Sequence, residues 1–321
     1  MPTIAPRTAS PVLIWGAILI LYVVWGSTYL AIRVAVDTFP PFVMGAVRFS
    51  IAGAIMITVA TITSRGSIAR PTLRELRDIA IIGTCLMFGG MGLVSWAEQT
   101  VPSGIAGVLI ALMPMWVAVY ERAFFGARLP GLAVAGIVLG IVGVVVLVGQ
   151  GLGADNRLDP FGIAALVASP MAWAAGATFA AHGARLPSNP ILATGLEMFT
   201  GSLVLVAAAV VSGELTAFRP ENLSSEAILA TAYLTVVGSL IAFTAFVWVI
   251  RHAPLPLVTT YAFVNPVVAM ALGWAVGGEA LTGRTLVAAT VVLGAVALIT
   301  TAPAAPRAAE VPVGAAPARQ A

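Results

Sequence analysis

The sequence predicts an all-α integral membrane protein with ten transmembrane helices, arranged as two inverted five-helix repeats. Three observations support this fold class. Of the 321 residues, 60% are hydrophobic and only 9% are charged, against ~25% charged residues in soluble domains. The apolar residues form ten long runs, and the second half of the chain repeats features of the first. A soluble protein, or an enzyme with a soluble catalytic domain, is therefore excluded.

Each of the ten runs has nearly the length that an α-helix needs to cross a bilayer, which is ~20 mostly apolar residues for ~30 Å of hydrocarbon. The continuous apolar character excludes a transmembrane β-barrel, whose strands alternate apolar and polar residues over ~10 positions. The first run is too long for a signal peptide and lacks a cleavage site, so we expect a retained helix. The runs are residues 12–36, 42–63, 79–97, 104–120, 131–149, 161–181, 191–211, 227–250, 255–276 and 285–301.

An internal repeat divides the chain into two halves. Because each half carries five helices, an odd number, the second half must lie inverted in the membrane, an arrangement typical of secondary transporters with a substrate site at the midplane. We expect a first repeat over 12–149, a periplasmic linker over 150–160, a second repeat over 161–302 and a disordered cytoplasmic tail over 303–321. The matches at an offset of 152 include Trp96/Trp248, Pro102/Pro254, Pro114/Pro266 and Gly126/Gly278, and those at 148 include Trp25/Trp173 and Gly53/Gly201.

The arginines predict the orientation. All 16 basic residues are Arg. If the N-terminus is cytoplasmic, eleven of them fall in inner segments and only three, Arg157, Arg219 and Arg284, in outer loops. Positive charge is retained on the cytoplasmic side of membrane proteins, so both termini are expected to be cytoplasmic. Scattered single arginines do not form a phosphate-binding stripe, and no nucleic-acid partner is expected.

The sequence lacks the residues and motifs that several classes of protein chemistry require. The single Cys85 excludes an internal disulfide and multi-cysteine metal sites. The two histidines, His182 and His252, form no HExxH motif, and no G-x-S-x-G or Walker sequence is present. We therefore expect no enzyme, no metal site and no cofactor in this chain, and its partners to be the lipid bilayer and a small molecule.

A family resemblance covers nearly all of the chain, residues 12–302. It rests on WGSTYLAIR (25–33), PFVMGAVRF (41–49), VPSGIAGVLIALMP (101–114) and NPVVAMALGWAVGGEALT (265–282). These segments resemble EamA-type members of the drug/metabolite transporter superfamily. The resemblance implies a ten-helix exporter of small metabolites or drugs in the bacterial inner membrane, with a central cavity. One departure is that the family's Gly-Glu pair near the end of each half is Gly278-Glu279 here but Gly126-Ala127 in the first half.

Ionisable residues within or beside the runs suggest two gate pairs. A charge that faces lipid costs ~3 kcal/mol or more, so Arg48, ~9 Å below the outer helix end, is expected to face the interior. We predict an outer pair of Arg48 with Glu98 and an inner pair of Glu197 with Arg251, broken in turn. Alternatives stay open: Arg48 reaching the outer headgroups, and Glu197 as a fixed ion pair or a proton carrier. Glu98 and Glu197 are both compatible with proton coupling.

Polar and aromatic residues in mid-helix positions are candidates for a cavity wall, because aromatic rings offer contact area and a few polar groups orient a ligand. Pro114 and Pro266, at equivalent positions of the two halves, are candidate hinges. Gly136 and Gly140 form a G-x-x-x-G motif, which we interpret as a contact within the bundle. The candidate cavity residues are Trp25, Ser27, Thr28, Tyr29, Trp173, Tyr261 and Asn265.

The sequence thus favours an inner-membrane secondary transporter that exports small, amino-acid-like metabolites or drugs by alternating access. An importer of small metabolites is the nearest alternative, followed by a channel or a membrane scaffold. A channel would show a ring of like charge or a repeated filter, and the chain shows neither. The substrate, the coupling ion and the choice between monomer and homodimer stay open.

Overall fold

The structure is a computed structural model that describes residues 10–64, 69–148, 159–250, 252–253 and 255–301. Within these residues every regular element is helical, which confirms the all-α membrane fold. Eight helical stretches of this part of the chain are long and apolar enough to cross a membrane, and two further apolar helices are shorter. The ten predicted runs each coincide with one of these helical regions. Residues 150–158 of the predicted linker, the predicted tail and Arg251 lie outside the described residues, and Pro160, the last residue of the predicted linker, is the first of α9 (Pro160–His182).

The first half contains the first five helical regions. The first, third and fourth regions are composite, because π-helical turns or a break interrupt them. The elements are α1 (Pro11–Ile20), η1 (Leu21–Trp25) and α2 (Gly26–Ala35); α3 (Pro41–Thr63); α4 (Leu73–Gly83), η2 (Thr84–Gly92) and α5 (Leu93–Ala97); α6 (Ser103–Ile110) and α7 (Met113–Phe125); and α8 (Gly131–Val148).

The second half has the same order of regions, with a short connection between its second and third helices. That connection holds α11 (Glu214–Ala217) and the 3₁₀ turn η4 (Pro220–Asn222), which the sequence analysis did not predict. The remaining elements are α9 (Pro160–His182); α10 (Pro190–Val211); α12 (Ser225–Tyr233), η5 (Leu234–Ile241) and α13 (Ala242–Val249); α14 (Leu255–Val258) and α15 (Tyr261–Ala275); and α16 (Gly283–Thr301).

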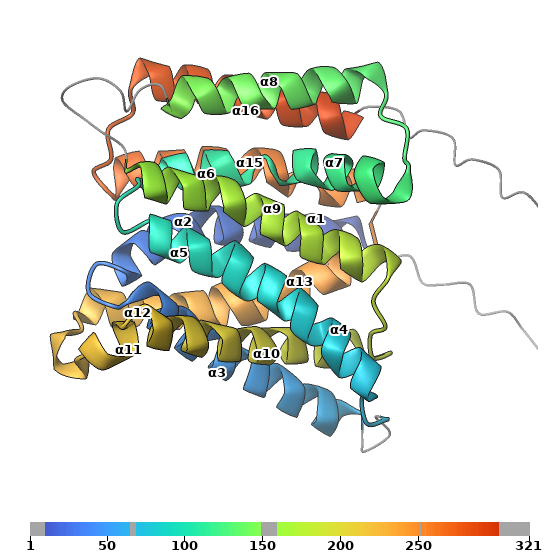
Figure 1. The fold of residues 1–321 in the computed structure, drawn as a ribbon, viewed down its shortest axis with the longest axis vertical. Helices are drawn as coiled ribbons and strands as arrows, with labels where there is room; N and C mark the ends of the chain where they lie inside the picture. The colour runs from blue at the N-terminus through green and yellow to red at the C-terminus, as the bar shows by residue number, and fades with distance from the viewer. Residues whose placement is uncertain (1–9, 65–68, 149–158, 251, 254, 302–321) are drawn as a thin grey trace, which may run out of the picture.

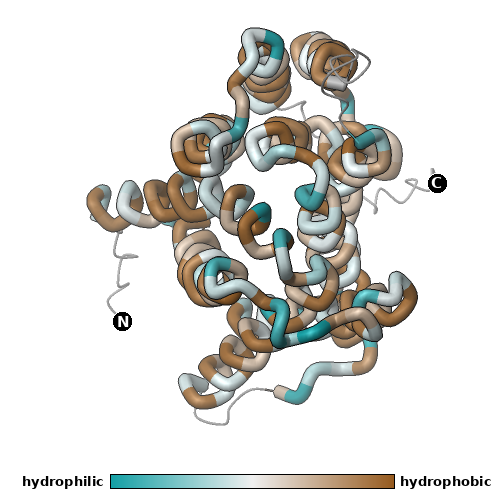
Figure 2. Tube along the Cα trace, turned by 90° about the vertical axis from the view of Figure 1, so that its left-hand side faces the viewer, coloured by the Kyte–Doolittle hydropathy of each residue, from teal (hydrophilic) through white to brown (hydrophobic). Residues whose placement is uncertain are grey.

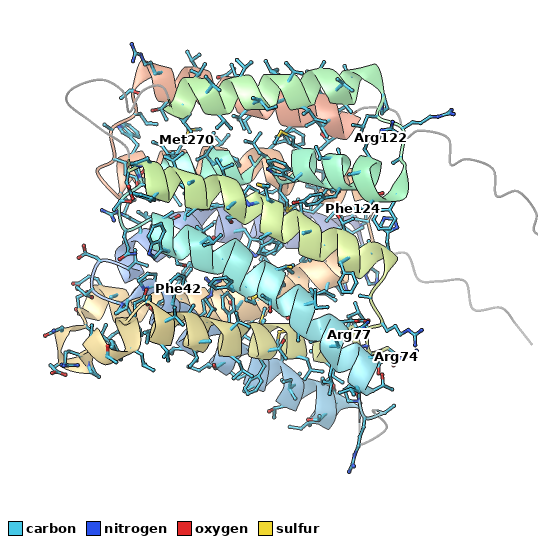
Figure 3. The ribbon with its side chains drawn as sticks, in the orientation of Figure 1. Phe42, Arg74, Arg77, Arg122, Phe124 and Met270 are labelled. Atoms are coloured by element: carbon cyan, nitrogen blue, oxygen red, sulfur yellow. The ribbon has the colours of Figure 1, made fainter. Side chains whose placement is uncertain are left out.

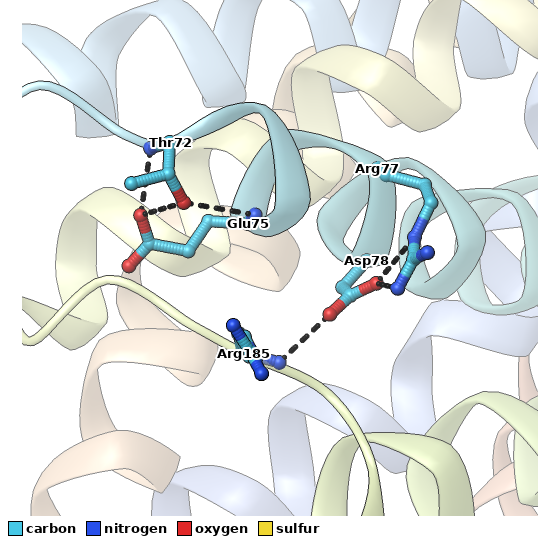
Figure 4. A network of polar contacts seen from close by, with 5 residues as sticks. All are labelled: Thr72, Glu75, Arg77, Asp78 and Arg185. Atoms are coloured by element: carbon cyan, nitrogen blue, oxygen red, sulfur yellow. Dashed lines mark hydrogen bonds and ion pairs between the residues drawn. The ribbon is translucent and has the colours of Figure 1, made fainter.

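The start of α4 differs from the prediction, which placed it six residues later, at residue 79. Thr72 and Glu75 form a capping box, in which each side chain bonds the other residue's backbone amide. In the next turn Asp78 accepts hydrogen bonds from the Arg77 side chain and, at 2.9 Å, from the backbone amide of Arg185 (Figure 4). The first turns of α4 carry charged residues on an amphipathic helix end, so they lie outside the charge-free run that predicted this helix.

The second helices of the two halves lie side by side, and so do the fifth helices. The second helices of the halves, α3 and α10, pack together at one side of the bundle, and the fifth helices, α8 and α16, form a separate pair at the other (Figures 1 and 2). A Cβ on Gly136 would lie 2.7 Å from Ile299 Cγ1, so this glycine permits the close contact of α8 with α16. The G-x-x-x-G motif therefore serves packing within the bundle, as expected.

The repeat is visible in backbone details. Gly126 and Gly278, matched in sequence, both have left-handed φ angles, of 66° and 67°. The third helix of each half contains a π-helical segment, η2 in the first half and η5 in the second. Shared irregularities at equivalent positions support two copies of one five-helix unit.

The distribution of side chains fits a membrane environment. Large apolar residues are exposed along the outward face of α8, among them Val138, Ile141 and Val145. Arg74, Arg77 and Arg122 lie at one end of the bundle (Figure 3). The helices are therefore apolar toward the surroundings, and positive charge gathers at one end.

Candidate substrate cavity

A cavity of about 100 Å³ lies between the two halves. On this measure one water needs roughly 10–15 Å³, so the space holds several waters or a small polar molecule. Both repeats contribute to its wall. The lining includes Trp25, Thr28, Tyr29, Arg48, Phe49, Gly90, Met91, Val94, Ile110, Met113, Ser169, Pro170, Trp173, Phe243 and Tyr261.

Five of the seven cavity residues predicted from the sequence line this space. Trp25 is at the centre of an aromatic cluster, with ring centroids 5.5 Å from Phe243, 5.3 Å from Phe246 and 5.0 Å from Tyr261. The contacts with Phe243 and Tyr261 are edge-to-face, an arrangement that aromatic rings favour. The cluster joins η1 of the first half to α13 and α15 of the second. It forms a broad apolar wall that can receive the apolar part of a ligand.

The other two predicted cavity residues, Ser27 and Asn265, are not among the lining residues. Ser27 Oγ lies 2.6 Å from the hydroxyl of Tyr233 and donates to the carbonyl of Val24, so it joins α2 to α12. Asn265 is buried on α15, and its Oδ1 has no hydrogen-bond partner in the described structure. Both lie on the expected helices, and Ser27 is bonded to a neighbouring one.

The π-helical segments shape the cavity. Trp25 ends η1, and Gly90 and Met91 belong to η2. A Cβ on Gly90 would lie 2.5 Å from Trp173 Cε3, so only glycine lets the Trp173 ring approach this backbone. Ser169 Oγ donates to the carbonyl of Gly90 at 2.9 Å. Such widened turns often occur at functional sites.

Arg48 is the charged residue of the cavity. Its side chain is buried, with the residue only 2% exposed, and its guanidinium carbon lies 4.7 Å from the ring centroid of Phe49. The Nε atom donates to Ser239 Oγ at 2.9 Å. Among the described residues that line the cavity, none is acidic. The cavity therefore carries a positive charge that no lining side chain neutralises.

The predicted outer pair of Arg48 with Glu98 is not formed in the described structure, and because the pair is expected to break during transport, its gating role stays a prediction. Arg48 bonds to Ser239, and both carboxylate oxygens of Glu98 lack a hydrogen-bond partner in the described structure. The reason is depth: Glu98 follows α5 at the outer end, whereas Arg48 lies seven residues into α3, roughly 10 Å deeper at 1.5 Å per residue.

The inner pair cannot be described as a contact, because Arg251 lies outside the described residues. Its predicted partner Glu197 is half-buried on α10. Glu197 is not among the residues that line the cavity. The pairing of Glu197 with Arg251 stays a prediction.

The two candidate hinge prolines differ in their surroundings. The fourth helical region is broken between α6 and α7, and Pro114 is the second residue of α7, where a missing amide hydrogen costs little. Pro266 lies inside α15, and so does Pro170 inside α9, which the sequence analysis did not single out. Pro170 lines the cavity, and its position within a long apolar run was the available signal.

Glu279 has a structural role that the sequence did not reveal. Its Oε1 accepts from the amide of Ser103 at 2.7 Å and its Oε2 from the amide of Gly104 at 3.0 Å. Glu279 thus caps the N-terminus of α6 in the opposite half, where negative charge is favoured. The residue at the matching position of the first half is Ala127, which has no carboxylate, so this cap belongs to one half.

The fold and the cavity together define the class: a multi-pass helical membrane protein built from two inverted repeats around an internal site, which is the architecture of secondary transporters. The chain belongs to the EamA-like transporter family, which matches residues 13–149 and again residues 160–301. The resemblance noted in the sequence is confirmed.

Named relatives agree with this membership. The chain is 37% identical over 288 residues to the "Uncharacterized inner membrane transporter YedA" of Escherichia coli strain K12, covering 89% of this chain and 90% of YedA. It is 28% identical over 298 residues to the "Probable terminal-alkyne amino-acid exporter" of Streptantibioticus cattleyicolor, covering 89% and 92%. A solved crystal structure shares the fold, with a TM-score of 0.58 at 24% identity over 90% of this chain and 96% of that one.

Proposed function

We propose that the protein is a secondary transporter that exports small, carboxylate-bearing metabolites of the amino-acid type across the inner membrane by alternating access. The observation that carries this proposal is the buried Arg48 in a cavity whose described lining holds no acidic side chain. A guanidinium binds a carboxylate through charge-assisted hydrogen bonds. A substrate carboxylate would supply the missing negative charge.

The aromatic wall around Trp25 supports the same substrate class. A metabolite with a carboxylate at one end and an apolar portion at the other would place the first at Arg48 and the second against Trp25 and Tyr261. The relative from Streptantibioticus cattleyicolor carries an amino-acid exporter's name. Cationic drugs fit less well, because the cavity already holds an uncompensated positive charge.

The charges of the cavity favour a carrier over a channel. A channel commonly lines its path with a ring of like charge, whereas Arg48 alone is charged among the described lining residues. We place both termini in the cytoplasm, since the end of the bundle that carries Arg74, Arg77 and Arg122 would be the inner one by the positive-inside rule. Export would then move substrate toward the opposite end.

Counterflow in proteoliposomes tests this function. Vesicles with purified protein would be loaded with each unlabelled compound of a panel, namely amino acids, their amides and cationic drugs, and uptake of the same labelled compound would be followed. We expect saturable counterflow of at least one carboxylate compound and none of its amide. Counterflow of cationic drugs alone would refute the substrate class, and flux without counterflow would favour a channel. Uptake by intact cells that express the protein, in place of efflux, would identify an importer.

A further inference from the structure

Glu98 is a buried carboxyl group without a partner. The residue is 0% exposed, and neither Oε1 nor Oε2 accepts a hydrogen bond within the described structure. Its backbone is satisfied, because the amide donates to the carbonyl of Val94 at 2.9 Å and the carbonyl accepts from Arg33. The polar atoms of Glu98 that lack a hydrogen bond are therefore the two oxygens of its carboxyl group.

The nearest guanidinium is engaged elsewhere. Arg33 Nη1 donates to the carbonyl oxygens of Glu98 at 2.6 Å and Gln99 at 2.9 Å, and not to the carboxylate. This contact joins the end of α2 to the loop between α5 and α6. A cation able to neutralise Glu98 is thus close by but bonded to backbone.

The second nearby charge has the same sign as an ionised Glu98. Glu279 is held on the amides of Ser103 and Gly104, at the other end of the same short loop. Burial, and after it the charge of Glu279, raises the pKa of Glu98 well above its usual range, and Arg33 offsets this only in part. Two carboxyl groups that share one site do not both ionise readily.

The other helices packed against this region offer no further partner. Tyr29 on α2 is near enough to interact electrostatically with Glu98, but it forms no hydrogen bond with the carboxyl group in the described structure. The helices α3 and α9 pack on α5, and their charged groups are Arg48, bonded to Ser239, and Asp159, which accepts from Thr100 at 2.9 Å. An ionised carboxylate here would lack any partner, which is far costlier than a neutral carboxyl group.

We propose that Glu98 is a proton-binding site that couples transport to the proton gradient: it is protonated while it is buried, as in this structure, and ionises when the protein opens a path from it to water. The inference rests on the proposed function for its coupling role, but the proton site itself does not. No other ion is required: the proton arrives from water on one side of the membrane, binds one carboxylate oxygen, and leaves to water on the other side.

The geometry links the proton to the outer contact. Once Glu98 ionises, its carboxylate becomes a stronger acceptor for Arg33 than the two carbonyl oxygens, because both partners are then charged. Arg33 would exchange carbonyl for carboxylate and release the end of α2 from the α5–α6 loop. Val94, one turn before Glu98, lines the cavity. The α5–α6 loop is therefore one helical turn away from the cavity wall.

Infrared difference spectroscopy of the purified protein during a pH titration tests the site. We expect a protonated-carboxyl band that disappears at a pH well above the usual range for Glu, is missing in Glu98→Gln, and persists in the matched control Glu197→Gln. Arg33→Gln, which leaves Glu98 in place, should raise the pH at which the band disappears. An unchanged band in Glu98→Gln, or no shift in Arg33→Gln, overturns the proposal.

Transport assays separate this inference from the proposed function. In proteoliposomes an imposed proton gradient should drive accumulation of the counterflow substrate by wild type, and the gradient-driven part should fall at least tenfold in Glu98→Gln. If wild type shows counterflow but the imposed proton gradient does not change substrate accumulation, the role of Glu98 in coupling is wrong while the proposed transport function stands. If no compound shows counterflow but the Glu98 band titrates as described, the function is wrong while the proton site stands.

Discussion

Arg48 of the first half and Ser239 of the second are joined by a 2.9 Å hydrogen bond from Nε to Oγ, deep in the bundle. The bond crosses the interface between the two repeats and orients the guanidinium that lines the cavity. The charge that we propose to bind substrate thus lies at the interface between the halves. If transport proceeds by alternating access, substrate binding and the relative position of the halves would be linked through this one side chain.

Replacing Ser239 by Ala should weaken substrate binding more than it lowers the amount of folded protein. The change leaves the buried Nε of Arg48 without an acceptor, and hydrogen bonds of charged groups contribute about 1.5–3 kcal/mol. We expect the substrate concentration for half-maximal counterflow to rise about tenfold or more.

Ser202→Ala is the matched control for that variant. Ser202 is also a buried helical serine, but its hydroxyl contacts Ser50 and the carbonyl of Phe199, away from the cavity lining. The role of Ser239 would be refuted by equal effects of the two substitutions on half-maximal counterflow.

Gly90→Ala should disturb the cavity wall. The new methyl group would lie 2.5 Å from Trp173 Cε3, and overpacking of this kind costs about 1–3 kcal/mol. We expect a lower melting temperature in detergent together with a loss of counterflow. Gly131→Ala, where an added Cβ meets open space, should leave both unchanged; similar behaviour of the two variants would contradict the assigned contact between Gly90 and Trp173.

Glu279→Ala should destabilise the protein through α6. The substitution removes the acceptor for two backbone amides at the helix start, and loss of an N-terminal cap costs about 0.5–2 kcal/mol. Thermal unfolding in detergent measures the effect. Glu221→Ala, an exposed change in η4, should have no effect, and an unchanged melting temperature for Glu279→Ala would show that the cap contributes nothing.

Acidification should weaken the start of α9 through Asp159. The hydroxyl of Thr100, with the amides of Phe161 and Gly162, lowers the pKa of Asp159 below its ordinary value. A carboxyl group whose pKa is lower in the folded state stabilises the protein above its unfolded pKa, and this contribution disappears as the pH falls through the folded pKa.

Melting temperatures measured from neutral pH down into the range of Asp titration test that dependence. Asp159→Asn should lose stability less steeply on acidification than wild type. The effect will be small, since the group is near the surface. Parallel curves for the two proteins would contradict the role of the carboxylate.

The sequence predicted the helices well because their signal is local. Uninterrupted apolar length marks each helical region, and the largest boundary error, at Leu73, arose where charges lie on an amphipathic end. The breaks were harder to foresee. In η2 the backbone of Gly90 packs against Trp173 of the other half, a long-range contact that no local sequence pattern encodes.

The sequence predicted several of the residues that line the cavity but not how each side chain is oriented. Trp25, Thr28, Tyr29, Trp173 and Tyr261 were identified from their polar or aromatic character in mid-helix, and they do line the cavity. Asn265 and Ser27 have the same character but do not line the cavity, because the rotation of a helix about its axis is set by its neighbours. The bond of Arg48 to Ser239 was not predicted, because charge complementarity suggested Glu98 and no sequence pattern marks a serine of the other half as a partner.

Competition during counterflow, in wild type and Arg48→Gln, tests the central claim most directly. For the best carboxylate substrate found, the free acid should inhibit labelled exchange by wild type at least tenfold better than its amide. Arg48→Gln, if folded to the same yield, should lose that discrimination. Equal inhibition by acid and amide in wild type, or discrimination that survives in Arg48→Gln, would contradict the assignment of Arg48 as the carboxylate-binding residue.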